Sequence, residues 1–267
     1  MLKILPCLDT VEMAASRRRE LDVPPDVAAA LGQSAVEASA MGYYIHSADR
    51  KVDWSHVVQA ACNARVSIPP DATLPALGSI PFTETRVRVT NETTLAASRR
   101  LVDAGEKPLA LNFANGIHPG GGFLGGARAQ EEVLCRSSAL YRTLVGDEMY
   151  AKHRQRPQSD STDWAIYSPN VPVFRTDDGT TLEHPWLLSF LTCAAPYAPA
   201  VGQPAAADLL RQRIHRVLSI AHAYGHPAVI LGAWGCGAFG NDIHRTAIDF
   251  RHALENDFNG VFSDVVF

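Results

Sequence analysis

Residues 112–132 read NFANGIHPGGGFLGGARAQEE, and this stretch decides more about the fold than any other part of the chain. An apolar run over residues 108–114 predicts a strand before it, and a helix is expected over about residues 127–145. The glycines between them allow the backbone to approach a ligand closely, because no Cβ stands in the way. The acids Glu131 and Glu132 come at the start of the helix and point back toward that ligand. The pattern favours a hydrolase acting on a phosphorylated or sugar-bearing substrate.

The same alternation of strands and helices continues on both sides of this stretch. The other expected strands are 85–90, 164–167, 171–175, 187–194, 228–231 and 260–267, and the other expected helices start near Asn91 or Thr93, after Pro204 and near Ile243. Such alternation predicts a layered α/β domain over residues 76–267. Residues 1–75 are expected to form a mostly helical accessory region, with one helix from Pro25 to about Ala40. A proline-rich connector at 68–81 separates the two parts, and together they form one compact unit.

Composition narrows the class of protein. The chain has 267 residues, 46% hydrophobic and 19% charged, which is typical of a globular protein. Its formal net charge of −4 argues against dedicated DNA binding. Five dispersed cysteines without a Cys-x-x-Cys pair indicate free thiols in a reducing compartment. The interrupted apolar N-terminus and the lack of a long apolar stretch predict no secretion and no membrane span, so a cytoplasmic location is expected.

A second glycine-rich loop, at 232–240, also lies between an expected strand and an expected helix. Such loops present free backbone N–H groups, and a helix start favours anions. Two of them in one domain favour a ligand with an extended anionic middle, such as a diphosphate. Neither loop is a P-loop or a clean dinucleotide fingerprint. The alternative is that the glycines serve tight turns only.

Glu131 and Glu132 are neighbours in a first helical turn, so their side chains are expected to point about 100° apart. They are therefore not expected to act as a facing acid and base. One is expected to be catalytic while the other holds a substrate hydroxyl, and Gln130 adds a neutral hydrogen-bonding group that fixes a sugar. The alternative is that the two acids only complement the helix dipole.

These motifs resemble those of poly(ADP-ribose) glycohydrolases. The glycine triplet followed by Gln130-Glu131-Glu132 resembles the signature of that family, and residues 112–115 look like the start of the ligand loop of macrodomains. The second loop, over 235–240, is similar to that of compact bacterial-type members. The resemblance covers roughly residues 80–267. It implies a macrodomain-like sheet flanked by helices that binds ADP-ribose and hydrolyses the ribose–ribose O-glycosidic bonds of poly(ADP-ribose).

The resemblance also implies roles for single residues. Glu132 would protonate the departing ribose oxygen and then deprotonate the attacking water. Glu131 would hold ribose hydroxyls, Asn115 would contact the distal ribose, and Phe239 would pack on the terminal ribose or the adenosine side. The implied lining of the diphosphate is Gly121, Gly122, Gly235, Cys236, Gly237, Ala238 and Gly240.

Two rival functions stay open at this point. One is a non-catalytic ADP-ribose-binding module, and the other is a hydrolase of another ADP-ribosyl linkage. The Gln-Glu-Glu run favours an enzyme, because a binding module needs no acid. The expected partners are poly(ADP-ribose), ADP-ribose and ADP-ribosylated proteins. No cofactor and no metal is expected, because histidines and cysteines form no tetrahedral set. The run Arg17-Arg18-Arg19 is expected to be a solvated helix face, with contact to polymer phosphates as the alternative.

Overall fold

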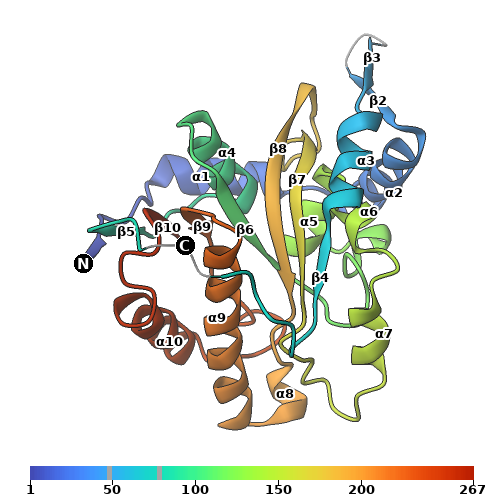
Figure 1. Ribbon diagram of the computed structural model, residues 1–267. Coiled ribbons are helices and arrows are strands. Elements are labelled where there is room, and N and C mark those ends of the chain that lie inside the picture. Colours follow the sequence, from blue (N-terminus) through green and yellow to red (C-terminus); the bar gives the residue numbers. More distant parts are fainter. Residues whose placement is uncertain (47–49, 77–79) are drawn as a thin grey trace.

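A mostly parallel sheet forms the centre of the computed structural model, which describes residues 1–46, 50–76 and 80–267 (Figure 1). Its strands are β1 (Leu2–Ile4), β4 (Val66–Ile68), β5 (Thr85–Arg88), β6 (Pro108–Phe113), β7 (Ala165–Arg175), β8 (Thr181–Cys193), β9 (Ala228–Ile230) and β10 (Asp264–Val266). They lie in the order β1-β5-β10-β9-β6-β8-β7-β4. The pairs from β1 to β8 in this order are parallel, while β7 and β4 are antiparallel to their neighbours. A separate hairpin joins β2 (Tyr43–His46) and β3 (Arg50–Asp53).

Helices cover both faces of this sheet, which confirms the layered α/β prediction. They are α1 (Val11–Leu21), α2 (Pro25–Met41), α3 (Ser55–Ala64), α4 (Thr94–Asp103), α5 (Gln130–Ser137), α6 (Leu140–Leu144), α7 (Glu148–Arg154), α8 (Ala198–Val201), α9 (Ala205–Ala223) and α10 (Ile243–Glu255). Helices α9 and α10 share one hydrophobic core with the sheet, and α2 to α7 share the other. Figure 1 shows α9 in front of the sheet and α5 behind it. Strand β6 is buried on both faces, as its sequence, apolar except for Asn112, predicts.

The first 75 residues contribute to the central sheet as well as to the helices. Strand β1 pairs with β5 at one edge, and β4 pairs with β7 at the other, so both edge strands come from this region. Each is only three residues long, too short for a periodic pattern. Helix α2 starts at Pro25 as expected and ends at Met41, and the left-handed backbone of Gly42 (φ 76°) caps it.

Four predicted elements differ from the observed ones. The helix expected over 127–145 is two helices, α5 and α6, because Ser138 is extended and bridges to Val173 of β7. The Ser138 hydroxyl donates to the Leu134 carbonyl and accepts from the Leu140 N–H, which ends one helix and starts the next. The two strands expected within 164–175 are one strand with an irregular register at Ser168–Val171. Strand β8 begins before residue 187, at Thr181.

Among the described residues, no helix is long and apolar enough to cross a membrane.

Candidate active site

The two glycine-rich loops meet at the carboxyl ends of two central strands. Strands β6 and β9 are parallel neighbours, and each loop follows the carboxyl end of its strand. Open α/β sheets bind ligands at the carboxyl ends of their strands. A pocket of about 370 Å³ opens between the loops. Its lining consists of Phe113, Ala114, Asn115, Ala129, Gln130, Glu131, Glu132, Ala195, Ala233, Trp234, Gly235, Gly237, Ala238 and Phe239.

Glu132 has one carboxylate oxygen anchored and one free. The carboxylate is buried, with 8% of the residue exposed. Its Oε1 accepts a hydrogen bond of 3.0 Å from the Gly122 N–H of the first loop. Its Oε2 is buried and accepts no hydrogen bond from any described residue. A buried oxygen without a partner is costly unless a ligand supplies one, so this atom is suited to meet substrate.

Glu131 is held more tightly. Its Oε2 accepts from the Asn115 N–H at 2.7 Å, and its Oε1 accepts from the Asn112 side-chain amide at 3.3 Å. Burial raises the pKa of Glu131 to about 8, and the Glu132 carboxylate adds to the rise. The hydrogen bond from Asn115 opposes it. Glu131 therefore keeps its proton at neutral pH.

Both carboxylates reach the same glycine. A Cβ added at Gly121 would lie 2.3 Å from Oε1 of Glu132 and 3.1 Å from Oε2 of Glu131. The expectation that neighbouring acids in a helical turn diverge is therefore wrong here, because their flexible side chains converge on one point of the loop. Gly121 has a left-handed backbone (φ 59°), which other residues adopt at a cost. Neither Gly121 nor Gly122 lines the pocket itself; both lie beside the carboxylates.

The side chain of Gln130 forms its hydrogen bonds within the protein, to two backbone groups and to the Thr94 hydroxyl. Its Oε1 accepts from the Phe113 N–H at 2.9 Å, and its Nε2 donates to the Leu111 carbonyl at 2.7 Å. The side chain therefore ties α5 to β6 and fixes where the two acids stand. A role in holding a sugar stays a prediction, and the geometry favours the positioning role.

Asn112 belongs to the 112–115 motif, but the sequence predicted no role for its side chain. It is fully buried in β6, and its amide donates to Glu131 at 3.3 Å and to the Thr192 hydroxyl at 3.2 Å. The available signal was one amide in an otherwise apolar strand, because a buried polar side chain needs partners.

Asn115 shapes the start of the first loop. Its side-chain oxygen accepts from the N–H groups of Ile117 and His118, each at 3.0 Å, which forms a tight turn. The ring of His153 contacts the Gly116 carbonyl at 3.0 Å and fixes the loop from α7. His118 is exposed and does not line the pocket.

The second loop presents free donors to the pocket. The backbone N–H groups of Gly235, Gly237, Ala238 and Phe239 donate to no described residue, and all four residues line the pocket. Several free backbone N–H groups in one loop beside a pocket suit a diphosphate. Asn241, which the sequence motifs did not reveal, holds the loop, donating to the carbonyls of Pro196 at 2.9 Å and Gly235 at 3.0 Å.

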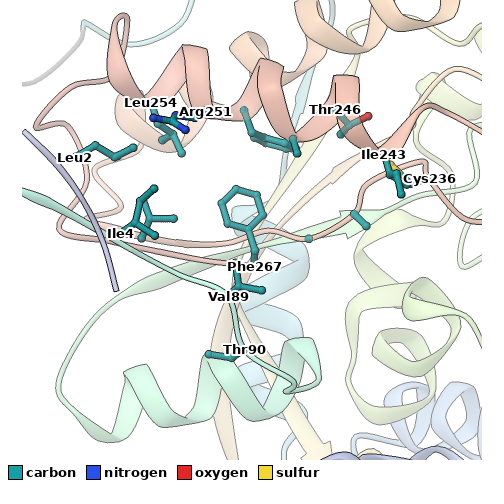
Figure 2. Close-up of a pocket in the computed structure, with 15 residues that line it drawn as sticks. Leu2, Ile4, Val89, Thr90, Cys236, Ile243, Thr246, Arg251, Leu254 and Phe267 are labelled. Carbon is teal, nitrogen blue, oxygen red and sulfur yellow. The ribbon is translucent and has the colours of Figure 1, made fainter. Parts of the chain in front are cut away.

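Two predicted residues of the second loop lie elsewhere. Gly240 does not line the pocket, and Cys236 lines a second pocket of about 480 Å³. This second pocket lies between α10 and strands β1, β5 and β10, with apolar side chains such as Val89, Ile243 and Phe267 around it (Figure 2). Ala233 lines both pockets, so they adjoin.

The N-terminal helices support the first loop from behind. A Cβ on Gly32 of α2 would lie 2.7 Å from the Phe123 carbonyl, so this helix packs directly on the loop. The buried guanidinium of Arg175 donates to the carbonyls of Leu31 in α2 (2.8 Å) and Arg136 in α5 (3.2 Å). Residues 1–75 thereby fix the helix that carries the two acids.

Within the described ranges, no group of three or more His, Cys, Asp and Glu side chains is arranged to hold a metal ion. The expected independence from metals stays a prediction.

Comparisons with known proteins agree on one family. The model of the microbial-type poly(ADP-ribose) glycohydrolase (PARG) catalytic domain matches residues 32–176. Poly(ADP-ribose) glycohydrolase from Thermomonospora curvata is a similar solved structure, with 40% identity over 90% of this chain and 92% of that chain and a TM-score of 0.82. The same protein bound to the inhibitor ADP-HPD is 42% identical over 90% of this chain and 92% of that chain, with a TM-score of 0.82.

The enzyme from Deinococcus radiodurans in complex with ADP-ribose is also similar. It is 40% identical over 81% of this chain and 91% of that chain, with a TM-score of 0.73. A search of curated protein sequences gave no match.

Proposed function

The chain belongs to the family of microbial-type poly(ADP-ribose) glycohydrolases, and from this premise we propose that Glu132 is its general acid and base. It is a hydrolase that acts on the glycosidic bonds of poly(ADP-ribose), with the macrodomain-like fold of that family. The observation that supports the role of Glu132 is its buried, unpartnered Oε2 beside a pocket with free N–H donors. Incubation with poly(ADP-ribose) and chromatography of the released ADP-ribose tests the function.

The proposed reaction needs one carboxyl group in two roles. Glu132 donates its proton to the ribose oxygen that leaves, while the bond from this oxygen to the anomeric carbon breaks. The anomeric carbon becomes oxocarbenium-like, and the Glu132 carboxylate then removes a proton from water as the water oxygen bonds to that carbon. The products are ADP-ribose and a polymer shortened by one unit. Glu131 holds ribose hydroxyls during both steps.

The ligand can be arranged along the two adjoining pockets. We infer that the N–H groups of the second loop bind the diphosphate and that the terminal ribose lies between Glu132 and Phe239. The adenine base is a flat aromatic ring system, and its faces fit the neighbouring apolar pocket beyond Ala233. ADP-ribosylated proteins are the proposed carriers of the polymer.

The raised pKa of Glu131 predicts a pH dependence. Burial raises this pKa to about 8, so Glu131 is uncharged at neutral pH, and above that pH its carboxylate can no longer donate a hydrogen bond to a ribose hydroxyl. We expect kcat/KM to be nearly constant around neutral pH and to fall as the pH rises through about 8. Affinity for ADP-ribose, measured by calorimetry over the same range, separates binding from chemistry. A rate that stays constant well into the alkaline range would mean that the proton on Glu131 has no part in the reaction.

Phe239 supplies a second prediction. Its half-buried ring borders the pocket and packs edge-on against Tyr197, with 5.8 Å between ring centroids. Phe239→Ala is expected to weaken ADP-ribose binding by about 2 kcal/mol, the usual cost of a lost aromatic anchor. Phe239→Tyr keeps the ring and serves as the control. Calorimetry measures both variants, and unchanged affinity and turnover in Phe239→Ala would remove the ring from the site.

A further inference from the structure

An open cleft of about 740 Å³ lies outside the two pockets described above. One wall is α1, which contributes Arg17 and Arg18, and the other includes Arg128 from the segment just before α5. Asn91, which follows β5, and Asp22, which follows α1, complete its polar lining. Three guanidinium groups thus face one carboxylate in a chain whose formal net charge is −4.

Two of the three cations are free to bind an anion. Arg17 is paired with Glu20 of its own helix at 2.6 Å. Arg18 and Arg128 are exposed, and neither forms an ion pair with any carboxylate that the structure describes. Arg128 uses one nitrogen to donate to the Val23 carbonyl at 3.1 Å, which holds the side chain at the cleft wall. The remaining donors of a guanidinium suit a phosphate oxygen.

The cleft adjoins the active site through consecutive residues. Arg128 lines the cleft, and the next residue, Ala129, lines the pocket that holds Glu132. On the other side, Asn91 lines the cleft, and Thr90 lines the apolar pocket. A substrate polymer that leaves the catalytic pocket past Ala129 therefore meets Arg128, and Arg18 lines the same cleft.

We propose that this cleft binds a diphosphate of the neighbouring ADP-ribose unit in the polymer. The inference rests on the proposed function, which makes the substrate a chain with a diphosphate in every unit. The N–H groups of the second loop match the diphosphate of the unit being released. The next diphosphate along the chain has no partner in the catalytic pocket, and the basic cleft supplies one.

The cleft contributes to the binding of the polymer and not to the cleavage of the bond. A contact made equally in the bound and transition states changes KM and leaves kcat unchanged. Exposed charge pairs contribute little singly, so the double variant Arg18→Ala/Arg128→Ala is expected to raise KM for polymer about five- to ten-fold at low salt. The loss of two phosphate contacts should also flatten the salt dependence of binding, by about 1.4 in the logarithmic slope if the polymer behaves as a single-stranded nucleic acid does.

The charge-matched control is Arg19→Ala/Arg211→Ala. Arg19 follows Arg18 on the same helix, and Arg211 lies on α9; both are exposed, and neither lines the cleft. Release of ADP-ribose from purified polymer is measured at ~50 mM and ~200 mM salt, together with calorimetry of free ADP-ribose and thermal melting of every variant. The cleft variant should show the higher KM and the flatter slope, with near-normal affinity for ADP-ribose, while the control resembles the wild type.

Two outcomes would overturn the inference. In one, the cleft variant keeps the KM and salt slope of the wild type. In the other, the control shifts as much as the cleft variant, which means that only total charge matters. Neither can be confused with failure of the proposed function, because in that case the wild type itself would release no ADP-ribose.

Discussion

Glu132→Gln is expected to lower the hydrolysis of poly(ADP-ribose) by about 10²–10⁴-fold, the usual contribution of a positioned general acid. The amide cannot donate the proton of a carboxylic acid to the leaving ribose oxygen, and it cannot remove a proton from water afterwards. Its oxygen can still accept the Gly122 N–H, so the first loop should stay in place. Affinity for ADP-ribose should therefore remain close to that of the wild type.

The measurement combines polymer cleavage with calorimetry of ADP-ribose. Glu148→Gln is the matched control, because Glu148 also lies in a first helical turn but is exposed and does not line the pocket. It should retain wild-type turnover. If Glu132→Gln keeps more than about a tenth of the wild-type rate, Glu132 is not the general acid.

The local parts of the site could be predicted from the sequence because each is encoded by neighbouring residues. A glycine loop between a strand and a helix places Glu131 and Glu132 at a helix start, whatever the rest of the chain does. The pairing of β6 with β9 is not local, and only the structure shows that this parallel pairing brings the second loop beside the first. The family resemblance then supplied the activity, which the comparisons support.

The remaining parts depend on contacts between distant residues, which no local pattern encodes. The side chain of Asn112 reaches Glu131 from another element, and Arg175 joins α2 to α5 across the fold. The side chain of Cys236 turns to the second pocket although its neighbours in sequence line the first. The sequence also did not predict that the side chains of Glu131 and Glu132 converge, because backbone geometry gives the direction of Cβ but not of a long side chain.

Gly121→Ala tests whether that convergence matters for catalysis. The new methyl group would lie 2.3 Å from Oε1 of Glu132, and the left-handed backbone (φ 59°) is itself unfavourable for alanine. Glu132 or the loop must therefore move, and a displacement of about 1 Å at a reacting group costs on the order of 10²-fold in rate. Turnover of polymer should fall by about that factor.

Gly125→Ala is the control in the same loop. Its added methyl group meets nothing within 4 Å, and its backbone lies outside the left-handed region. Its turnover should match the wild type, and thermal melting of both variants separates a displaced carboxylate from a loss of folding. Near-normal turnover in a folded Gly121→Ala variant would mean that the loop yields without moving Glu132, and the close packing of that carboxylate on the glycine would then have no part in the reaction.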